Sequence, residues 1–184
     1  MRTNTANARA KAKVYAEVLL AAARISNNIF AVAGELDELT KTVRGSLELR
    51  KALSDKAIPA EAKKAIVAEL FVGYAPELLA TFDVMVDRED LSVLHRVQET
   101  YVTLAEEALS AVFIDVTSVV PLDEALRQQI IAKYSAQMNR GVLLREYVDP
   151  SLIGGIVLST HGKRIDASVS SQLESARHVL YKTW

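Results

Sequence analysis

The sequence contains no cysteine, which excludes disulfide bonds, thiol catalysis and cysteine-ligated metal sites. No apolar run approaches the roughly 18 residues of a membrane span, so we expect no insertion into a membrane. The basic first 13 residues lack a following apolar core and a cleavage site, which argues against a signal peptide. The net charge of −1 comes from acids and bases mixed along the chain, so no long-range field favours nucleic acid. We therefore expect a protein that is cytosolic or attached to something cytosolic.

Glycine is scarce in the first part of the chain, where it occurs between residues 6 and 108 only at Gly34, Gly45 and Gly73. This part is rich in alanine and leucine, the composition of helices. Prolines and capping residues divide it into six predicted helices: residues 7–25, a stretch ending near 44, 46–54, two stretches opened by Pro59 and Pro76, and 91–109.

After Ser110 the hydrophobic period changes. Val112, Ile114 and Val116 alternate with other residues, which predicts a strand. A helix follows, with apolar residues four apart and Gly141 as its expected cap. Strands are then expected at 142–148 and 153–160 with Asp149-Pro150 turning between them, and a last helix at 168–181 with Ser168 or Ser171 near its start. The prediction is α+β, an N-terminal six-helix bundle (1–108) followed by a small C-terminal α/β domain (109–184).

One segment resembles a phosphate-binding loop, because Gly162-Lys163 follows a glycine pair, Gly154 and Gly155. A phosphate loop needs glycine where the chain has Val157, and a hydroxyl where it has Arg164. The pattern instead favours a β-hairpin that turns at His161-Gly162, with a bulge or a close backbone approach at the glycine pair.

Other catalytic candidates are weaker. The three histidines, His95, His161 and His178, share no metal-ligand spacing. An acidic cluster at 87–90 lies at a helix junction, where capping and solvation explain it. No serine occupies a Gly-x-Ser-x-Gly elbow. We therefore expect no cofactor, no metal and no enzymatic activity.

The first helix has more apolar surface than one side of a core requires. Lys13, Glu17 and Arg24 share one narrow sector, and the rest of residues 14–25 is Val, Tyr, Ala, Leu or Ile. One interpretation is a central helix surrounded by its own bundle. The other is that one flank forms a groove for an outside helix. The fifth helix adds a small second apolar strip at Ala80 and Val84.

Three segments resemble a known family. They are KAKVYAEVLL (11–20), TFDVMVDREDLSVLHRV (81–97) and REYVDPSLIGGIVLSTHGKRIDASVSSQLESARHVL (145–180), and they look like the δ subunit of bacterial F-type ATP synthase, whose mitochondrial relative is the oligomycin-sensitivity-conferring protein. The signature is densest in the last segment, where we assign structural roles to Gly154, Gly155, Gly162, Asp166 and Ser168. Two departures are Val14, where many members have proline, and Asp90, where the family has arginine.

The resemblance implies a non-catalytic subunit of the stator, in one copy, at the cytoplasmic face of the bacterial membrane. Its N-terminal domain would bind the amphipathic N-terminal helix of an α subunit, and its C-terminal domain would bind the end of the b-subunit stalk. The residues expected to line the α-helix groove are Tyr15, Val18, Ala22, Ala80 and Val84, while Leu19, Leu20 and Ala23 would face the core. Two alternatives stay open: a free-standing helical adaptor with another helical ligand, and a small nucleotide-using enzyme.

Overall fold

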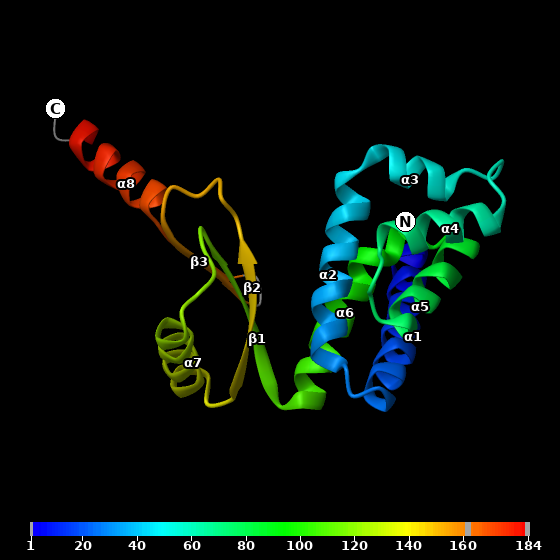
Figure 1. Cartoon of the computed structure of the whole chain (residues 1–184), viewed down its shortest axis with the longest axis horizontal. Coiled ribbons are helices and arrows are strands. Elements are labelled where there is room, and N and C mark those ends of the chain that lie inside the picture. Colours follow the sequence, from blue (N-terminus) through cyan, green and yellow to red (C-terminus); the bar gives the residue numbers. More distant parts are fainter. Residues whose placement is uncertain (1, 161–162, 183–184) are drawn as a thin grey trace. The chain divides into compact units, whose positions relative to one another are not determined.

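The structure, a computed structural model, describes residues 2–160 and 163–182, and of these it leaves out the side chains of 2–5, 175, 176 and 178–182. The chain divides into two compact units, Met1–Glu107 and Ala108–Trp184. The described residues form eight α-helices, a short 3-10 helix and one four-stranded sheet (Figure 1), so the α+β class is confirmed.

The first unit is helical. Its elements are α1 (Arg2–Ile25), α2 (Ile29–Gly45), α3 (Leu47–Ser54), α4 (Ala60–Leu70), α5 (Pro76–Asp87), the 3-10 helix η1 (Leu91–Val93) and α6 (Leu94–Leu109). The helix starts follow local chemistry: Ser46 Oγ accepts a hydrogen bond from the Leu49 amide at 3.1 Å, and Pro76 occupies the first turn of α5. Pro59, expected inside the first turn of α4, instead precedes that helix as its N-cap.

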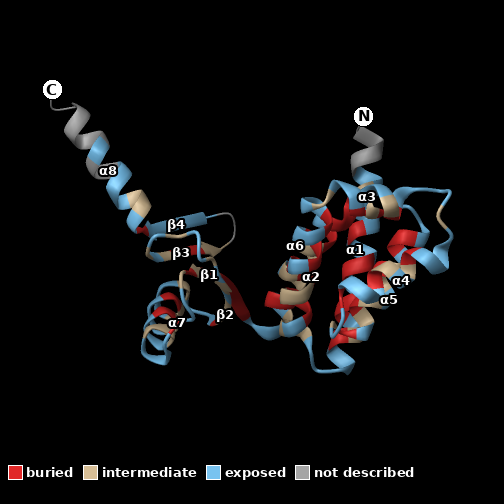
Figure 2. Ribbon diagram, turned by 45° about the horizontal axis from the view of Figure 1, so that its top comes forward, coloured by how far each residue is buried: buried red, intermediate tan, exposed pale blue. Residues whose placement is uncertain are grey.

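The core of this unit lies between α1 and its neighbours, and Figure 2 shows the buried residues on the faces that the helices turn toward one another. Leu19, Leu20 and Ala23 are buried, as expected from the helical wheel. Val14 and Val18, on another flank of α1, are each 58% exposed. The first helix is therefore not surrounded by its own bundle, and the central-helix interpretation is wrong.

The second unit is a mixed sheet with strand order β2-β1-β3-β4. Its strands are β1 (Ala111–Ser118), β2 (Gly141–Val148), β3 (Gly155–Thr160) and β4 (Lys163–Ser168), and its helices are α7 (Glu124–Met138) and α8 (Val169–Lys182). β1 pairs in parallel with β2, to which α7 is the crossover, and antiparallel with β3, which pairs antiparallel with β4. Ile114 and Val116 of β1 are fully buried in a core that includes Ile130 and Tyr134 of α7.

Two expected turns differ from the structure. α7 ends at Asn139 in the left-handed conformation (φ 50°), which asparagine tolerates, whereas Gly141 begins β2 opposite Ala111. The turn at Asp149-Pro150 connects β2 to β3, but these strands are not neighbours because β1 lies between them. The strand expected from residue 153 begins at Gly155.

The signature segment closes the second unit. Gly155 has φ +84°, and a Cβ there would lie 2.4 Å from the Ala167 carbonyl oxygen, so the backbones of β3 and β4 approach closely. The Ser168 hydroxyl accepts a hydrogen bond from the Ser171 amide at 3.2 Å at the start of α8, and the Asp166 carboxylate accepts one from the Ser168 amide at 3.0 Å. β3 and β4 form the expected hairpin, whose turn, His161-Gly162, lies outside the described residues.

Candidate partner-binding groove

A groove of about 470 Å³ runs between α1 and α5. It is lined by one face of each helix, on which residues recur every three or four positions. These residues are Val14, Tyr15, Val18 and Ala22 from α1, and Glu77, Ala80, Thr81, Val84 and Arg88 from α5. The five groove residues expected from the sequence are all among them, so the structure brings these side chains together in one surface.

The two helices that form this groove run antiparallel. At one end, the Ser26 hydroxyl that follows α1 donates a hydrogen bond to the Glu77 carboxylate in the first turn of α5. At the other end, Lys11 and Tyr15 contact Asp90, which follows α5. Both helices are continuous through this region, so each side of the groove is formed by one regular helix.

Most of the groove wall is apolar and open to solvent. Val18 and Val14 are 58% exposed and Val84 is 43% exposed, while Ala80 is exposed and Ala22 is half-buried. A contiguous apolar surface on a small protein marks an interaction site more often than a single exposed apolar side chain does. The charged residues of the groove, Glu77 and Arg88, stand at its opposite ends.

Tyr15 forms the floor of the groove rather than its wall, since the residue is buried. Its hydroxyl donates a hydrogen bond to Asp90 Oδ2 at 3.0 Å. Burial, followed by the neighbouring Asp90 carboxylate, raises the pKa of the Tyr15 phenol above its ordinary value. The hydrogen bond to Asp90 therefore holds the phenol hydroxyl in place at the floor of the groove.

The environment of Asp90 contradicts the expectation that the acidic cluster at 87–90 consists of capping and solvated side chains. Asp90 is 8% exposed and makes no side-chain capping bond to η1. Its Oδ1 accepts a hydrogen bond from Lys11 Nζ at 2.6 Å, so it joins the loop after α5 to α1. Burial alone would raise the pKa of Asp90, but the hydrogen bonds from Lys11 and Tyr15 outweigh it and hold the pKa below its ordinary value.

This link was missed in the sequence because its partners are 79 and 75 residues apart. The signal in the sequence is an acid at position 90 and a lysine, Lys11, one turn before Tyr15. Such a pair is recognised only when the two segments are known to meet.

Among the described residues, those weighed for catalysis do not gather into a site. Within residues 2–160 and 163–182, no three His, Asp or Glu side chains are placed to hold a metal ion. Val157 is buried in β3, and Lys163 and Arg164 begin β4 instead of a helix. His95 lies 3.4 Å from Glu99 one turn along α6, and His161 and the side chain of His178 are outside the described residues.

None of the described helices is long and apolar enough to span a bilayer.

Comparison with known proteins gives one consistent result. The sequence profile of the "ATP synthase delta (OSCP) subunit" family matches residues 12–180. The chain is 34% identical over 171 residues to an ATP synthase subunit delta of Anaeromyxobacter dehalogenans, covering 92% of this chain and 96% of that one. It is 32% identical over 165 residues to the same subunit of Microcystis aeruginosa, covering 89% and 91%.

A solved structure shares the fold. A chain of the Toxoplasma gondii mitochondrial ATP synthase hexamer superposes with a TM-score of 0.50 at 19% identity, and the match covers 92% of this chain and 97% of that chain.

Proposed function

The chain belongs to the ATP synthase delta (OSCP) subunit family, a family of non-catalytic subunits of that complex, and from this premise we propose that it joins the catalytic head to the peripheral stalk. In this role one copy of the chain sits at the cytoplasmic face of a bacterial membrane as a peripheral protein. Rotation inside the head drives ATP synthesis and proton transport only if the head is held against the torque. A holding joint needs slow dissociation, and buried apolar contact provides it without catalytic groups.

We assign the head-binding surface to the groove between α1 and α5, in the N-terminal six-helix bundle. Its apolar walls, at Val14, Val18 and Val84, fit the apolar face of an amphipathic helix, whose side chains three and four apart would enter between the two rows. The partner is the N-terminal helix of an α subunit. The exposed apolar groove is the observation that carries this proposal, because the fold of this unit does not need it.

The second unit is assigned to the C-terminal end of the b subunit. The support is the division of the chain into two compact units, since a joint between two partners requires two separate surfaces.

The experiment is a calorimetric titration with a peptide of the α-subunit N-terminus. Val18→Asp places a charge in the groove without disturbing the core, because the side chain is 58% exposed. The unpaired charge, once covered by the peptide, should weaken binding by about 3 kcal/mol or more, while the melting temperature stays near that of the parent.

Two further variants make this titration decisive. Leu20→Asp introduces the charge into the core and should unfold the unit, with a loss of about 3 to 5 kcal/mol of stability. Val72→Asp changes an exposed valine outside the groove and should bind like the parent. If Val18→Asp binds like Val72→Asp, or unfolds like Leu20→Asp, the groove assignment is wrong.

The free-standing adaptor is the second candidate function, because the same groove would accept the apolar face of any amphipathic helix. A competition experiment distinguishes the two candidate functions, because an adaptor would bind another amphipathic helix in preference to the α-subunit peptide.

A further inference from the structure

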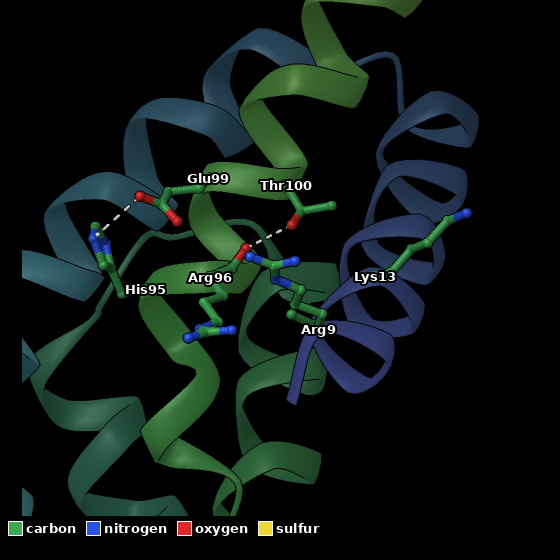
Figure 3. A pocket seen from close by; sticks show the side chains of 7 residues that line it. Arg9, Lys13, His95, Arg96, Glu99 and Thr100 are labelled. Carbon is green, nitrogen blue, oxygen red and sulfur yellow. Dashed lines mark hydrogen bonds and ion pairs between the residues drawn. The ribbon is translucent and has the colours of Figure 1, made fainter. Parts of the chain in front are cut away.

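A second surface of the first unit is basic. Two hollows meet there and share His95 as a lining residue. One, of about 610 Å³, lies between α1 and α6 and is drawn in Figure 3. The other, of about 460 Å³, lies between the end of α2, α3 and the start of α6 with η1.

Four arginines line these hollows. Arg9 and Arg96 belong to the first, where Figure 3 shows them between α1 and α6, and Arg44 and Arg50 belong to the second. In the part of the chain that the structure describes, none of the four has a carboxylate within ion-pairing distance. The single acid in either lining, Glu99, lies beside His95. We refer to these four arginines as the basic band.

Several other cations of the same unit are paired with carboxylates. Lys11 contacts Asp90 at 2.6 Å, Lys41 contacts Asp37 at 2.6 Å, and Lys56 contacts Glu89 at 3.1 Å. The chain as a whole carries a net charge of −1, so the basic band is not the local part of a general excess of positive charge. Like charges gathered without counter-charges repel, and a bound anion relieves that repulsion.

We propose that the basic band docks an acidic segment of a partner protein, through glutamate or aspartate side chains that enter the two hollows. Guanidinium groups present a planar fork of donors that matches a carboxylate in bidentate geometry. The arginines are divided between two hollows, so one small anion cannot contact them all, whereas a polypeptide with several carboxylates can. The hollows favour projecting side chains over the flat surface of a lipid bilayer.

This surface is distinct from the groove between α1 and α5. α1 contributes to both, but Arg9 and Lys13 line the hollow while Val14 and Val18 line the groove. The proposal therefore does not depend on the proposed function: a loss of binding at one surface leaves the other intact.

The test is fluorescence anisotropy of a labelled glutamate-rich peptide titrated with the whole protein at low salt. The parent should show saturable binding that weakens as salt is added. Arg9→Ala with Arg96→Ala, and Arg44→Ala with Arg50→Ala, should each weaken binding by about tenfold, since each pair removes charged hydrogen bonds. A matched control, Arg24→Ala with Arg140→Ala, removes two exposed arginines outside both hollows and should retain parental affinity.

Three results would overturn the proposal: no saturable binding by the parent, an equal loss in the control pair, or a peptide displaced by millimolar inorganic phosphate alone. Binding to vesicles containing phosphatidylglycerol, without binding to the peptide, would assign the basic band to a lipid surface and would also overturn it. Thermal melts of each variant confirm that it is folded before it is titrated.

Discussion

At the scale of single residues, Asp90 connects the loop after α5 to the first helix, and it does so through a charge that must stay ionised. Its carboxylate accepts hydrogen bonds from Lys11 at 2.6 Å and from Tyr15 at 3.0 Å, and the Tyr15 ring beneath the groove is fixed by the second of these. The stability of the bundle and the shape of the groove floor are therefore linked at this residue.

This link predicts a pH dependence. The pKa of Asp90 in the folded protein lies below its ordinary value of 3.8, so its contribution to stability is present above pH 3.8 and is lost as the pH falls through the folded pKa. Asp90→Asn should cost about 1 kcal/mol at pH 7, a modest amount because the Lys11 side chain is 46% exposed and water screens the pair. Urea unfolding of parent and variant from pH 7 to pH 3 should show the difference shrinking below pH 3.8.

The control for this experiment is Asp87→Asn, which changes an exposed acid at the end of α5 that lies 3.7 Å from Lys64 Nζ. It should leave stability nearly unchanged at every pH. A cost of Asp90→Asn that stays constant down to pH 3 would contradict the assigned role of the ionised carboxylate.

Alanine substitutions at two glycines should change stability in opposite directions. Gly155→Ala adds a Cβ 2.4 Å from a carbonyl oxygen at a φ of +84°, and should destabilise the second unit by about 1 to 3 kcal/mol. Gly34→Ala, inside α2 with open space for the added Cβ, should stabilise the first unit by about 0.5 to 1 kcal/mol. Thermal unfolding measures both, and a Gly155→Ala protein as stable as the parent would mean that β3 and β4 do not approach as described.

At the scale of elements, α1 has two faces that line candidate binding surfaces, and its core face lies between them. Val14, Val18 and Ala22 face the α5 side, and Arg9 and Lys13 face the α6 side. The residues between them, Ala16 and Leu19 among others, are fully buried. One helix therefore holds the bundle together and also contributes to both candidate surfaces.

The width of the α1–α5 groove gives a prediction at this scale. Ala80→Trp adds a large ring to an exposed position of the groove, so the α-subunit peptide should bind at least about tenfold more weakly while the melting temperature changes little. Ala21→Trp, exposed on α1 outside the groove, is the matched control and should bind normally. Equal affinity of both variants would mean that the peptide binds elsewhere.

Elements that depend on local sequence could be predicted, and those that depend on distant contacts could not. The groove residues were predictable because positions 15, 18 and 22, and 80 and 84, share faces by helical period alone, whereas Val14 was not expected to line the groove. The ion pair of Asp90 with Lys11 was not, since only the tertiary fold brings these residues together. The end of α7 at Asn139 was missed because asparagine and the nearby glycine are both suitable left-handed caps, and the pairing of Gly141 with Ala111 decides between them.

At the scale of the whole molecule, a bridge between head and stalk requires two units that fold and bind separately. The helices of the first unit bury their apolar faces against one another, so a fragment of residues 1–108 should fold alone. Circular dichroism recorded during heating should show one cooperative unfolding transition. A disordered fragment would contradict the division of the chain into independent units.

A three-component sedimentation experiment tests whether this chain bridges the catalytic head and the stalk. The head complex, the protein and a soluble C-terminal piece of the b subunit are mixed and separated by size. We expect one complex that contains all three with a single copy of this chain, and we expect Val18→Asp to stay with the b-subunit piece but to release the head. A parent protein that binds only one partner at a time, or neither, would contradict this bridging role.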